Sequence, residues 1–260
     1  MTGLFVFILC ALLLIGGYAV YGRVAERVFR GHPDLVMPCD QHGDGVDFVP
    51  LPSWKVFMIQ LLNIAGLGPV VGAISGCLFG PVALLWIVFG CIFAGAVHDF
   101  LSAMLSAYSG GKNLPELLGH WMGPKMRHAM RVMCLLLLVM VGVIFTRTPA
   151  EMLAQNLPLS ATVLCAIILV YYFLATILPV QAIIGRLYPV FAALFLFMAV
   201  AMVARLPFCG REVLPNLDFF SNLHPKGTPV WPMIFVTISC GAISGFHGTQ
   251  SPLMVRCLKE

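Results

Sequence analysis

The chain has 260 residues, of which 60% are hydrophobic and only 10% are charged, and its mean hydropathy is +0.96. This composition excludes an ordinary soluble domain and indicates a polytopic membrane protein embedded in a lipid bilayer. The net charge of +4 does not indicate a nucleic-acid partner, because the basic residues are spread over the connections between apolar segments and no RNA- or DNA-binding motif accompanies them.

The nine cysteines support neither a disulfide framework nor a zinc site. No Cys-x-x-Cys motif occurs, and most of the cysteines lie in apolar segments, where a small buried hydrophobic residue is sufficient explanation. The sequence therefore indicates no metal and no cofactor.

The first apolar segment, residues 4–22, is expected to be an extra N-terminal membrane helix. It is not read as a cleaved signal peptide, because no positive charge precedes it and no Ala-x-Ala-like site follows it. The polar stretch 23–53 comes next. Its possible cation ligands are Asp40, His42, Asp44 and Asp47. A turn at Asp44-Gly45 is the preferred interpretation, since this dipeptide is ordinary turn chemistry.

The stretch that organises the chain is Asn63–Gly76, within an apolar segment at about 54–79. Gly66, Gly68 and Pro69 give it poor helicity. A second stretch, Cys240–Gly248, repeats its Gly-Ala-Ile-Ser-Gly sequence. Non-helical backbone at membrane depth is tolerated only where protein buries it or where it lines a cavity, so two interrupted helices predict a transporter binding site. The alternative is a helix-packing ridge, because the glycines recur at intervals of four.

Further membrane spans are expected between and after these two stretches. They are placed at about 82–108, 132–145, 160–178 and 188–204, with a last span that opens at Trp231-Pro232 and breaks at 241–252. The span at 132–145 is short between its flanking charges. The segment 114–122 has apolar residues at helical spacing, and is expected to lie in the membrane interface or to pack on the bundle as a connecting helix.

The span at 82–108 carries two ionisable side chains, His98 and Asp99. An ionisable residue inside a span is costly without a partner, so the pair is a candidate for proton coupling or gating. Because Asp99 lies late in the span, a structural polar contact near the interface is the alternative.

The distribution of Lys and Arg predicts that the N-terminus lies outside, with eleven basic residues on the inner connections and four on the outer ones. The two interrupted helices then run in opposite directions, as the first helices of two inverted repeats do. We therefore expect an all-α bundle of about six spans in one membrane transporter domain, 1–260. Its parts are the extra helix 4–22, a first five-span repeat at 54–204 and the start of a second repeat at 230–260, and the chain is expected to be the N-terminal part of a longer protein.

Five motifs, in order from about residue 40 to 252, resemble those of the carbon starvation protein CstA family of bacterial inner-membrane transporters. They are Asp44–Pro50, Ile64–Gly72, Ala94–Phe100, Leu117 with Met122-Gly123-Pro124, and Thr237–His247. The resemblance implies proton-coupled uptake of peptides or pyruvate during carbon starvation, and a LeuT-type arrangement in which both broken helices surround the substrate. The family often has a His-His pair where this chain has Ile59 and Gln60, and full-length members have most of a second repeat that is lacking here.

The candidate site follows from the two breaks. The proposed substrate-binding residues are Asn63, Gly66, Gly68, Pro69, Ser75, Gly241, Ser244, Gly245 and His247, and the residues proposed for proton coupling or gating are His98, Asp99 and His247. A half-helix N-terminus suits a substrate carboxylate, and a histidine titrates near neutrality, although a lone membrane histidine is also often a packing residue.

Two other classes of function stay open. A membrane-embedded enzyme would pair His98 with Asp99 or Ser244 with His247, but no third orienting group or catalytic motif supports it. A structural or regulatory membrane subunit, or an inactive fragment, is the other alternative.

Overall fold

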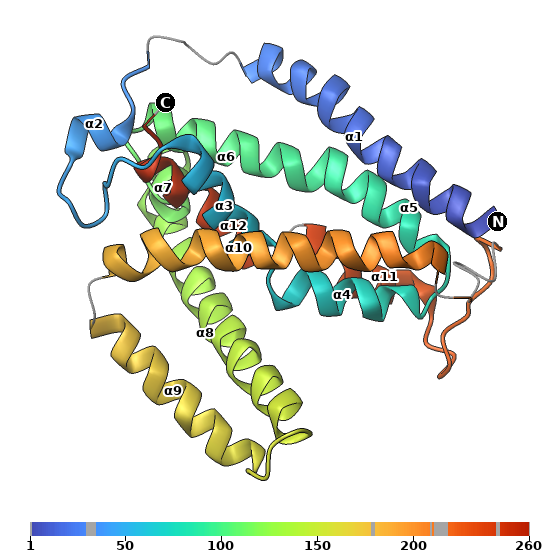
Figure 1. Ribbon diagram of the computed structural model, residues 1–260. Helices are drawn as coiled ribbons and strands as arrows, with labels where there is room; N and C mark the ends of the chain where they lie inside the picture. Colours follow the sequence, from blue (N-terminus) through green and yellow to red (C-terminus); the bar gives the residue numbers. More distant parts are fainter. Residues whose placement is uncertain are drawn as a thin grey trace.

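The computed structural model describes residues 2–29, 35–177, 180–208, 210, 218–242 and 245–259. Within these ranges the side chains at 2, 67, 180–187, 240–242 and 245–247 are not described. Regular structure in the described parts is helical, apart from one isolated bridge between Leu51 and Leu258 (Figure 1). The all-α expectation is confirmed.

The helices follow one another in the order expected from the apolar segments. They are α1 (Thr2–Phe29), α2 (Pro38–His42), α3 (Ser53–Ile64), α4 (Leu67–Cys77), α5 (Val82–Phe89), the π-helical segment η1 (Gly90–Gly95), α6 (Ala96–Tyr108), α7 (Leu114–Met122), α8 (Pro124–Ala154), α9 (Ala161–Ile177), α10 (Val180–Arg205), the 3-10 turn η2 (Leu206–Phe208), α11 (Val230–Ala242), α12 (Gly245–Met254) and the 3-10 turn η3 (Val255–Cys257).

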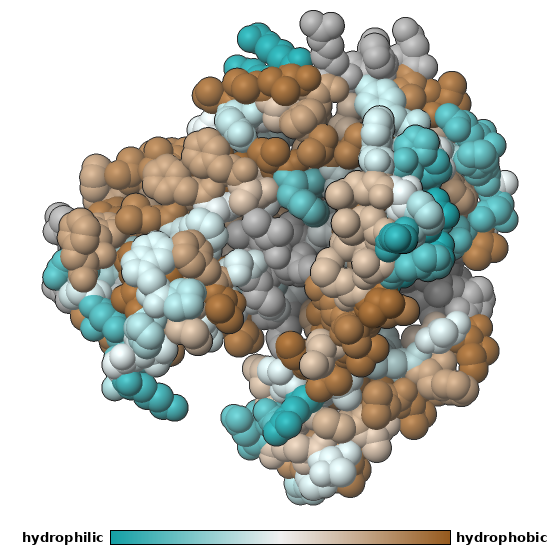
Figure 2. All heavy atoms as spheres, turned by 180° about the vertical axis from the view of Figure 1, so that it is seen from behind, coloured by the Kyte–Doolittle hydropathy of each residue, from teal (hydrophilic) through white to brown (hydrophobic). Residues whose placement is uncertain are grey.

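Four described helical stretches are long and apolar enough to cross a membrane, and a bent pair formed by α3 and α4 makes a fifth. Their outer faces are apolar, as lipid contact requires: Phe5 and Phe197, for example, are 65% and 72% exposed. Figure 2 shows one face on which hydrophobic residues cover much of the surface, with hydrophilic residues at the upper right and smaller groups at the top and along the lower edge. The expected spans at 160–178 and from 231 correspond to shorter apolar helices, α9 and Val230–Ser239.

The second apolar segment is interrupted, as expected, and its halves are bent by 46°. The break itself lies at Ala65 and Gly66, where Gly66 is extended at ψ −170°. Pro69 was expected in the break but lies in the first turn of α4. A proline fits there because the first N–H groups of a helix have no intrahelical acceptor in any case.

The alternative interpretation, in which the glycines allow close helix packing, also has support, at Gly76 and not at Gly66. Gly76 packs directly against Ile238 of α11, so closely that a Cβ at position 76 would lie 2.8 Å from the Ile238 Cδ1 atom. Ile238 belongs to a buried cluster with Phe79, Ala83 and Ile234. Gly66 thus marks the break, and Gly76 allows α4 and α11 to approach closely.

The two halves of the bent pair pack against α11 and α12. α4 packs along α11, and α3 packs against α12. Because the Phe79 ring lies 4.8 Å from the ring of His224, just before α11 begins, the C-terminal end of α4 lies beside the N-terminal end of α11. Helices α4 and α11 therefore run antiparallel. The second expected break, at 241–252, includes residues 243 and 244, which lie outside the described residues.

The connections gather at the two ends of the bundle as the alternation of spans requires. At one end, the Gly80 turn packs on Leu223. At the other, the Leu51 N–H donates to the Cys257 carbonyl at 2.9 Å. Which end faces the cytoplasm stays a prediction of the charge distribution.

Substitution of Gly76 tests the α4–α11 contact. We expect Gly76→Val to destabilise the protein by about 1–3 kcal/mol, because the new side chain overpacks a buried contact. The measurement is the midpoint of thermal unfolding in detergent. Gly16→Val is the matched control, since a Cβ at position 16 of α1 meets nothing within 4 Å. Equal midpoints for the two variants would contradict a close α4–α11 contact.

Candidate functional site

The span Val82–Tyr108 changes from α-helix to π-helix at Gly90–Gly95, directly before His98 and Asp99. Insertions of this kind are rare and occur frequently at functional sites. The sequence analysis missed this feature. The two glycines that bound the segment are a weak signal for it, because glycine is also common in ordinary membrane helices.

His98 and Asp99 form a polar pair that faces the second broken helix. The His98 Nδ1 lies 3.3 Å from the Asp99 Oδ1. The His98 ring packs on Gly248 of α12, where a Cβ would lie 2.9 Å from the Cε1 atom. The pair therefore lies against α12 and does not point simply to the membrane interface.

Two buried serines, Ser106 of α6 and Ser251 of α12, form hydrogen bonds between these two helices. The Ser251 hydroxyl donates to the Asp99 carbonyl at 2.9 Å. The Ser106 Oγ lies 2.7 Å from the Pro252 carbonyl and 2.9 Å from that of Lys112, and its single proton serves one of them at a time. Sequence reasoning missed this seam, although Asp99, Ser102 and Ser106 recur at helical spacing on one face of α6.

Of the candidate residues at the first break, Asn63 is near the end of α3, and Gly68 and Pro69 lie in the first turn of α4. Gly66 packs against Phe145 of α8, with a Cβ position 3.1 Å from the Phe145 Cζ atom. Ser75 lies eight residues beyond the start of α4, which is about 12 Å along the helix axis.

At the second break, Gly241 lies in the last turn of α11 and Gly245 and His247 in the first turn of α12. Ser244 lies outside the described residues, and so does the side chain of His247. Gln60, on α3 one turn before the first break, has a buried Oε1 with no hydrogen-bond partner among the described residues. This oxygen is available to accept a hydrogen bond from a ligand.

The run Asp44–Leu51 forms a strap at the end of the bundle. The Asp44 Oδ1 accepts the N–H groups of Val46, Asp47 and Phe48 at 2.8–2.9 Å, so a turn is what the structure shows here. These hydrogen bonds lower the pKa of Asp44. Their contribution to stability is thus present above the ordinary pKa of an aspartate and is lost as the pH falls through the lowered value.

Arg256, just beyond α12, ties this strap to the connection between α6 and α7. Its Nε donates to the Gly111 carbonyl at 2.7 Å, and its guanidinium lies 5.2 Å from the centre of the Phe48 ring. An Asp47 carboxylate oxygen lies 3.9 Å away. The strap therefore holds the end of α12 in place. No group of three metal-ligating side chains occurs within the described ranges.

The comparisons with known proteins decide the family. The family described as "Carbon starvation protein CstA" matches residues 2–155 and 132–252. The chain belongs to the carbon starvation protein CstA family. It is 41% identical to an uncharacterized membrane protein of Haemophilus influenzae, over 98% of this chain and 82% of the relative. The multi-pass character and the resemblance noted from the motifs are thereby confirmed.

Relatives with named functions are more distant. The peptide transporter CstA of Escherichia coli is 27% identical over 90% of this chain, and the pyruvate/proton symporter BtsT of the same organism is 24% identical over 90%. The chain spans about two fifths of the length of each: 42% and 41%. Both relatives are transporters, not enzymes. No solved structure matches the chain.

The reactivity of Cys39 tests whether the strap holds the end of α12 in place. Cys39 is 3% exposed, and its thiol donates to the Leu258 carbonyl at 3.0 Å. Burial raises the pKa of this thiol, so it reacts slowly at neutral pH.

We expect Arg256→Gln to speed maleimide labelling of a variant that retains only Cys39 by about tenfold, since a lost charge-assisted hydrogen bond is worth about 1.5–3 kcal/mol. Arg147→Gln, which removes an exposed ion pair, is the control. Similar rates in both variants would contradict the strap.

The serine seam makes a separate prediction. Ser106→Ala leaves the buried Lys112 and Pro252 carbonyls without this donor, and we expect a loss of about 1–3 kcal/mol. Ser221→Ala, in an exposed loop, is expected to change stability by less than about 0.5 kcal/mol. Thermal unfolding in detergent measures both, and an unshifted midpoint for Ser106→Ala would mean that the seam contributes nothing.

Proposed function

We propose that this chain forms the substrate site of a secondary active transporter that takes up small organic nutrients, peptides or pyruvate-like carboxylates, together with protons. The observation that carries the proposal is that the bent pair α3–α4 packs on α11 and α12, with α4 antiparallel to α11 and with His98 of an ionisable pair packed against Gly248 of α12. Broken helices that meet near the membrane midplane are typical of transporter binding sites.

The first break offers complementary groups for such a substrate. The N–H groups in the first turn of α4 lack intrahelical acceptors and carry partial positive charge, which suits a carboxylate. The buried Gln60 Oε1 suits an ammonium or amide N–H, groups that a peptide has and pyruvate lacks. His247, in the first turn of α12, is proposed to bind the carboxylate or to pass on the proton. Asn63 and Ser244 are proposed to add hydrogen bonds, and the LeuT-like inverted-repeat arrangement is part of the same proposal.

The proton site is proposed at His98 and Asp99. Protonation of the imidazole changes the charge of a ring that lies against the Gly248 backbone, and an imidazole titrates near neutrality. Proton binding at this pair would therefore favour one position of α12 over another. This gives a direct physical link between the coupling ion and the helix that borders the substrate.

The proposed setting is the bacterial cytoplasmic membrane with the N-terminus outside. The positive-inside distribution of basic residues supports this orientation. The peptide and pyruvate substrates rest on the names of relatives that are 24–27% identical.

Uptake into proteoliposomes tests the proposal. Labelled pyruvate and a labelled dipeptide are supplied with an imposed pH gradient, using this chain and a version extended with the second repeat of a relative. We expect His98→Gln to reduce gradient-driven uptake at least tenfold while substrate counterflow without a gradient persists, because a proton step is lost and the substrate site is kept.

Two controls accompany this experiment. Gly248→Leu should abolish both gradient-driven uptake and counterflow by displacing His98 and α12, whereas Gly16→Ala in open space on α1 should change neither. If a folded extended protein moved neither compound, the transport proposal would fail and a structural or regulatory subunit would be favoured.

A further inference from the structure

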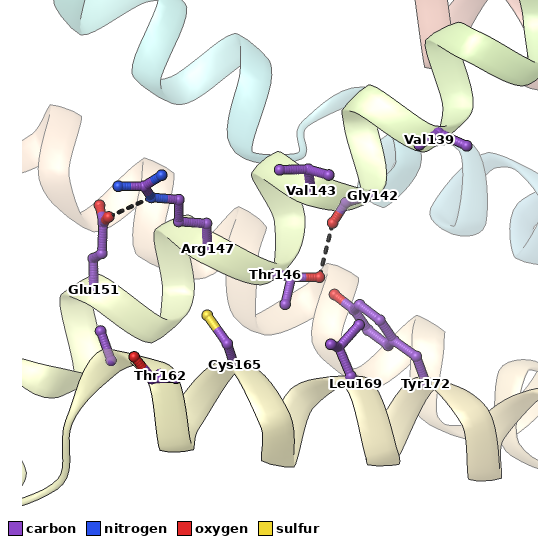
Figure 3. Close-up of a pocket in the computed structure, with 11 residues that line it drawn as sticks. Val139, Gly142, Val143, Thr146, Arg147, Glu151, Thr162, Cys165, Leu169 and Tyr172 are labelled. Carbon is purple, nitrogen blue, oxygen red and sulfur yellow. Dashed lines mark hydrogen bonds and ion pairs between the residues drawn. The ribbon is translucent and has the colours of Figure 1, made fainter.

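An open groove lies between α8 and α9, and its lining residue Tyr172 donates a hydrogen bond to the carbonyl of Phe145, the residue that packs on Gly66. Its volume is about 630 Å³, and its walls include Val139, Gly142, Thr146, Cys165, Leu169 and Tyr172. Figure 3 shows the α8 and α9 side chains facing each other across it. In Figure 1 these two helices extend away from the rest of the bundle, and α9 makes its principal contacts with α8 alone among the described elements.

Helix α8 is long and apolar enough to cross a membrane, but the uncharged stretch in its middle is short for a full span. Only 15 residues, 132–146, separate Arg131 from Arg147. They cover about 22 Å at 1.5 Å per residue, against a hydrocarbon core of about 30 Å. Arg147 pairs with Glu151 at 2.7 Å and both side chains are exposed, at 74% and 51%. The C-terminal part of α8 thus lacks the surroundings that membrane depth would require.

The family comparison divides within the same helix. The family matches the chain in two segments, 2–155 and 132–252, which overlap at 132–155 in α8. The alignment with the Haemophilus relative has 306 positions, to which 98% of this chain contributes about 255 residues. That relative therefore has about 51 residues with no counterpart here, enough for two membrane helices of about 20 residues and their connection.

We propose that α8 is a composite helix that joins the first part of one family helix to the last part of a later one, and that the α8–α9 groove is the binding surface for a hairpin of two apolar membrane helices. The relatives supply this hairpin from their own chain. Gly142 and Ala161 on the groove walls permit close helix approach. Omission of two spans also leaves the direction of every later span unchanged, so the antiparallel pairing of α4 and α11 is kept.

A graft tests this inference. The extra segment of about 51 residues from the Haemophilus relative is inserted within 132–155 of a variant that retains Cys165 as its only cysteine. We expect labelling of Cys165 by N-ethylmaleimide in detergent to slow at least tenfold, and the thermal unfolding midpoint to rise. The same segment inserted in the exposed loop at 218–229 is the control, and should protect Cys165 less.

Three results would overturn the inference. The first is a folded graft with unchanged Cys165 labelling. The second is an oxidative Cys165–Cys165 crosslink between two copies of the ungrafted chain, which would make the groove a self-association surface. The third result applies if the graft does not fold. Cysteines are then placed in the Haemophilus relative, one at the position aligned with Cys165 and one in each helix of its extra segment, and the absence of any crosslink between them would overturn the inference.

Discussion

The constraint on which this structure depends is that backbone N–H and C=O groups inside a membrane need partners. Helix α3 ends at Ile64, and the chain passes through Gly66 before α4 begins, so polar backbone groups are released in the middle of an apolar segment. They are tolerable because α4 lies along α11 and α3 along α12, which surrounds one break with the other interrupted helix. The close contact of Gly76 with Ile238 is what brings these helices together.

Much of this arrangement could be predicted from the sequence, because length, hydropathy and glycine content are local properties. The interruption between α3 and α4, the α7 helix with its Asn113–Glu116 capping box and the turn at Asp44 all follow from such signals. Pro69 misled the placement of the break, since proline is as compatible with a first helical turn as with a loop. The π-helix depends on packing against α1, where Ile92 lies on Gly17, and a single sequence does not reveal this long-range contact.

The serine seam was missed for a similar reason. A serine or threonine in a membrane helix often donates its hydroxyl proton to a backbone carbonyl of its own helix, as Thr146 does to Gly142. Only the structure shows that Ser106 and Ser251 connect α6 with α12. Helix α12 is consequently held at three levels: by His98 at Gly248, by the serines, and by Arg256 at its end. A displacement of α12 has to break the hydrogen bonds of the serines and of Arg256 and the packing of His98 on Gly248.

The direction of the two broken helices is insensitive to the number of spans between them, provided that spans are lost or gained in pairs. A chain that lacks one helix hairpin can therefore retain the packing of α4 on α11 and of α3 on α12, while the helices nearest the omission lose their neighbours. The structure has a close-packed cluster around Ile234 and Phe79, whereas α8 and α9 extend away from the bundle, which is the contrast expected if a hairpin is missing beside them. The geometry of the breaks and the completeness of the bundle around them are thus separable properties of this fold.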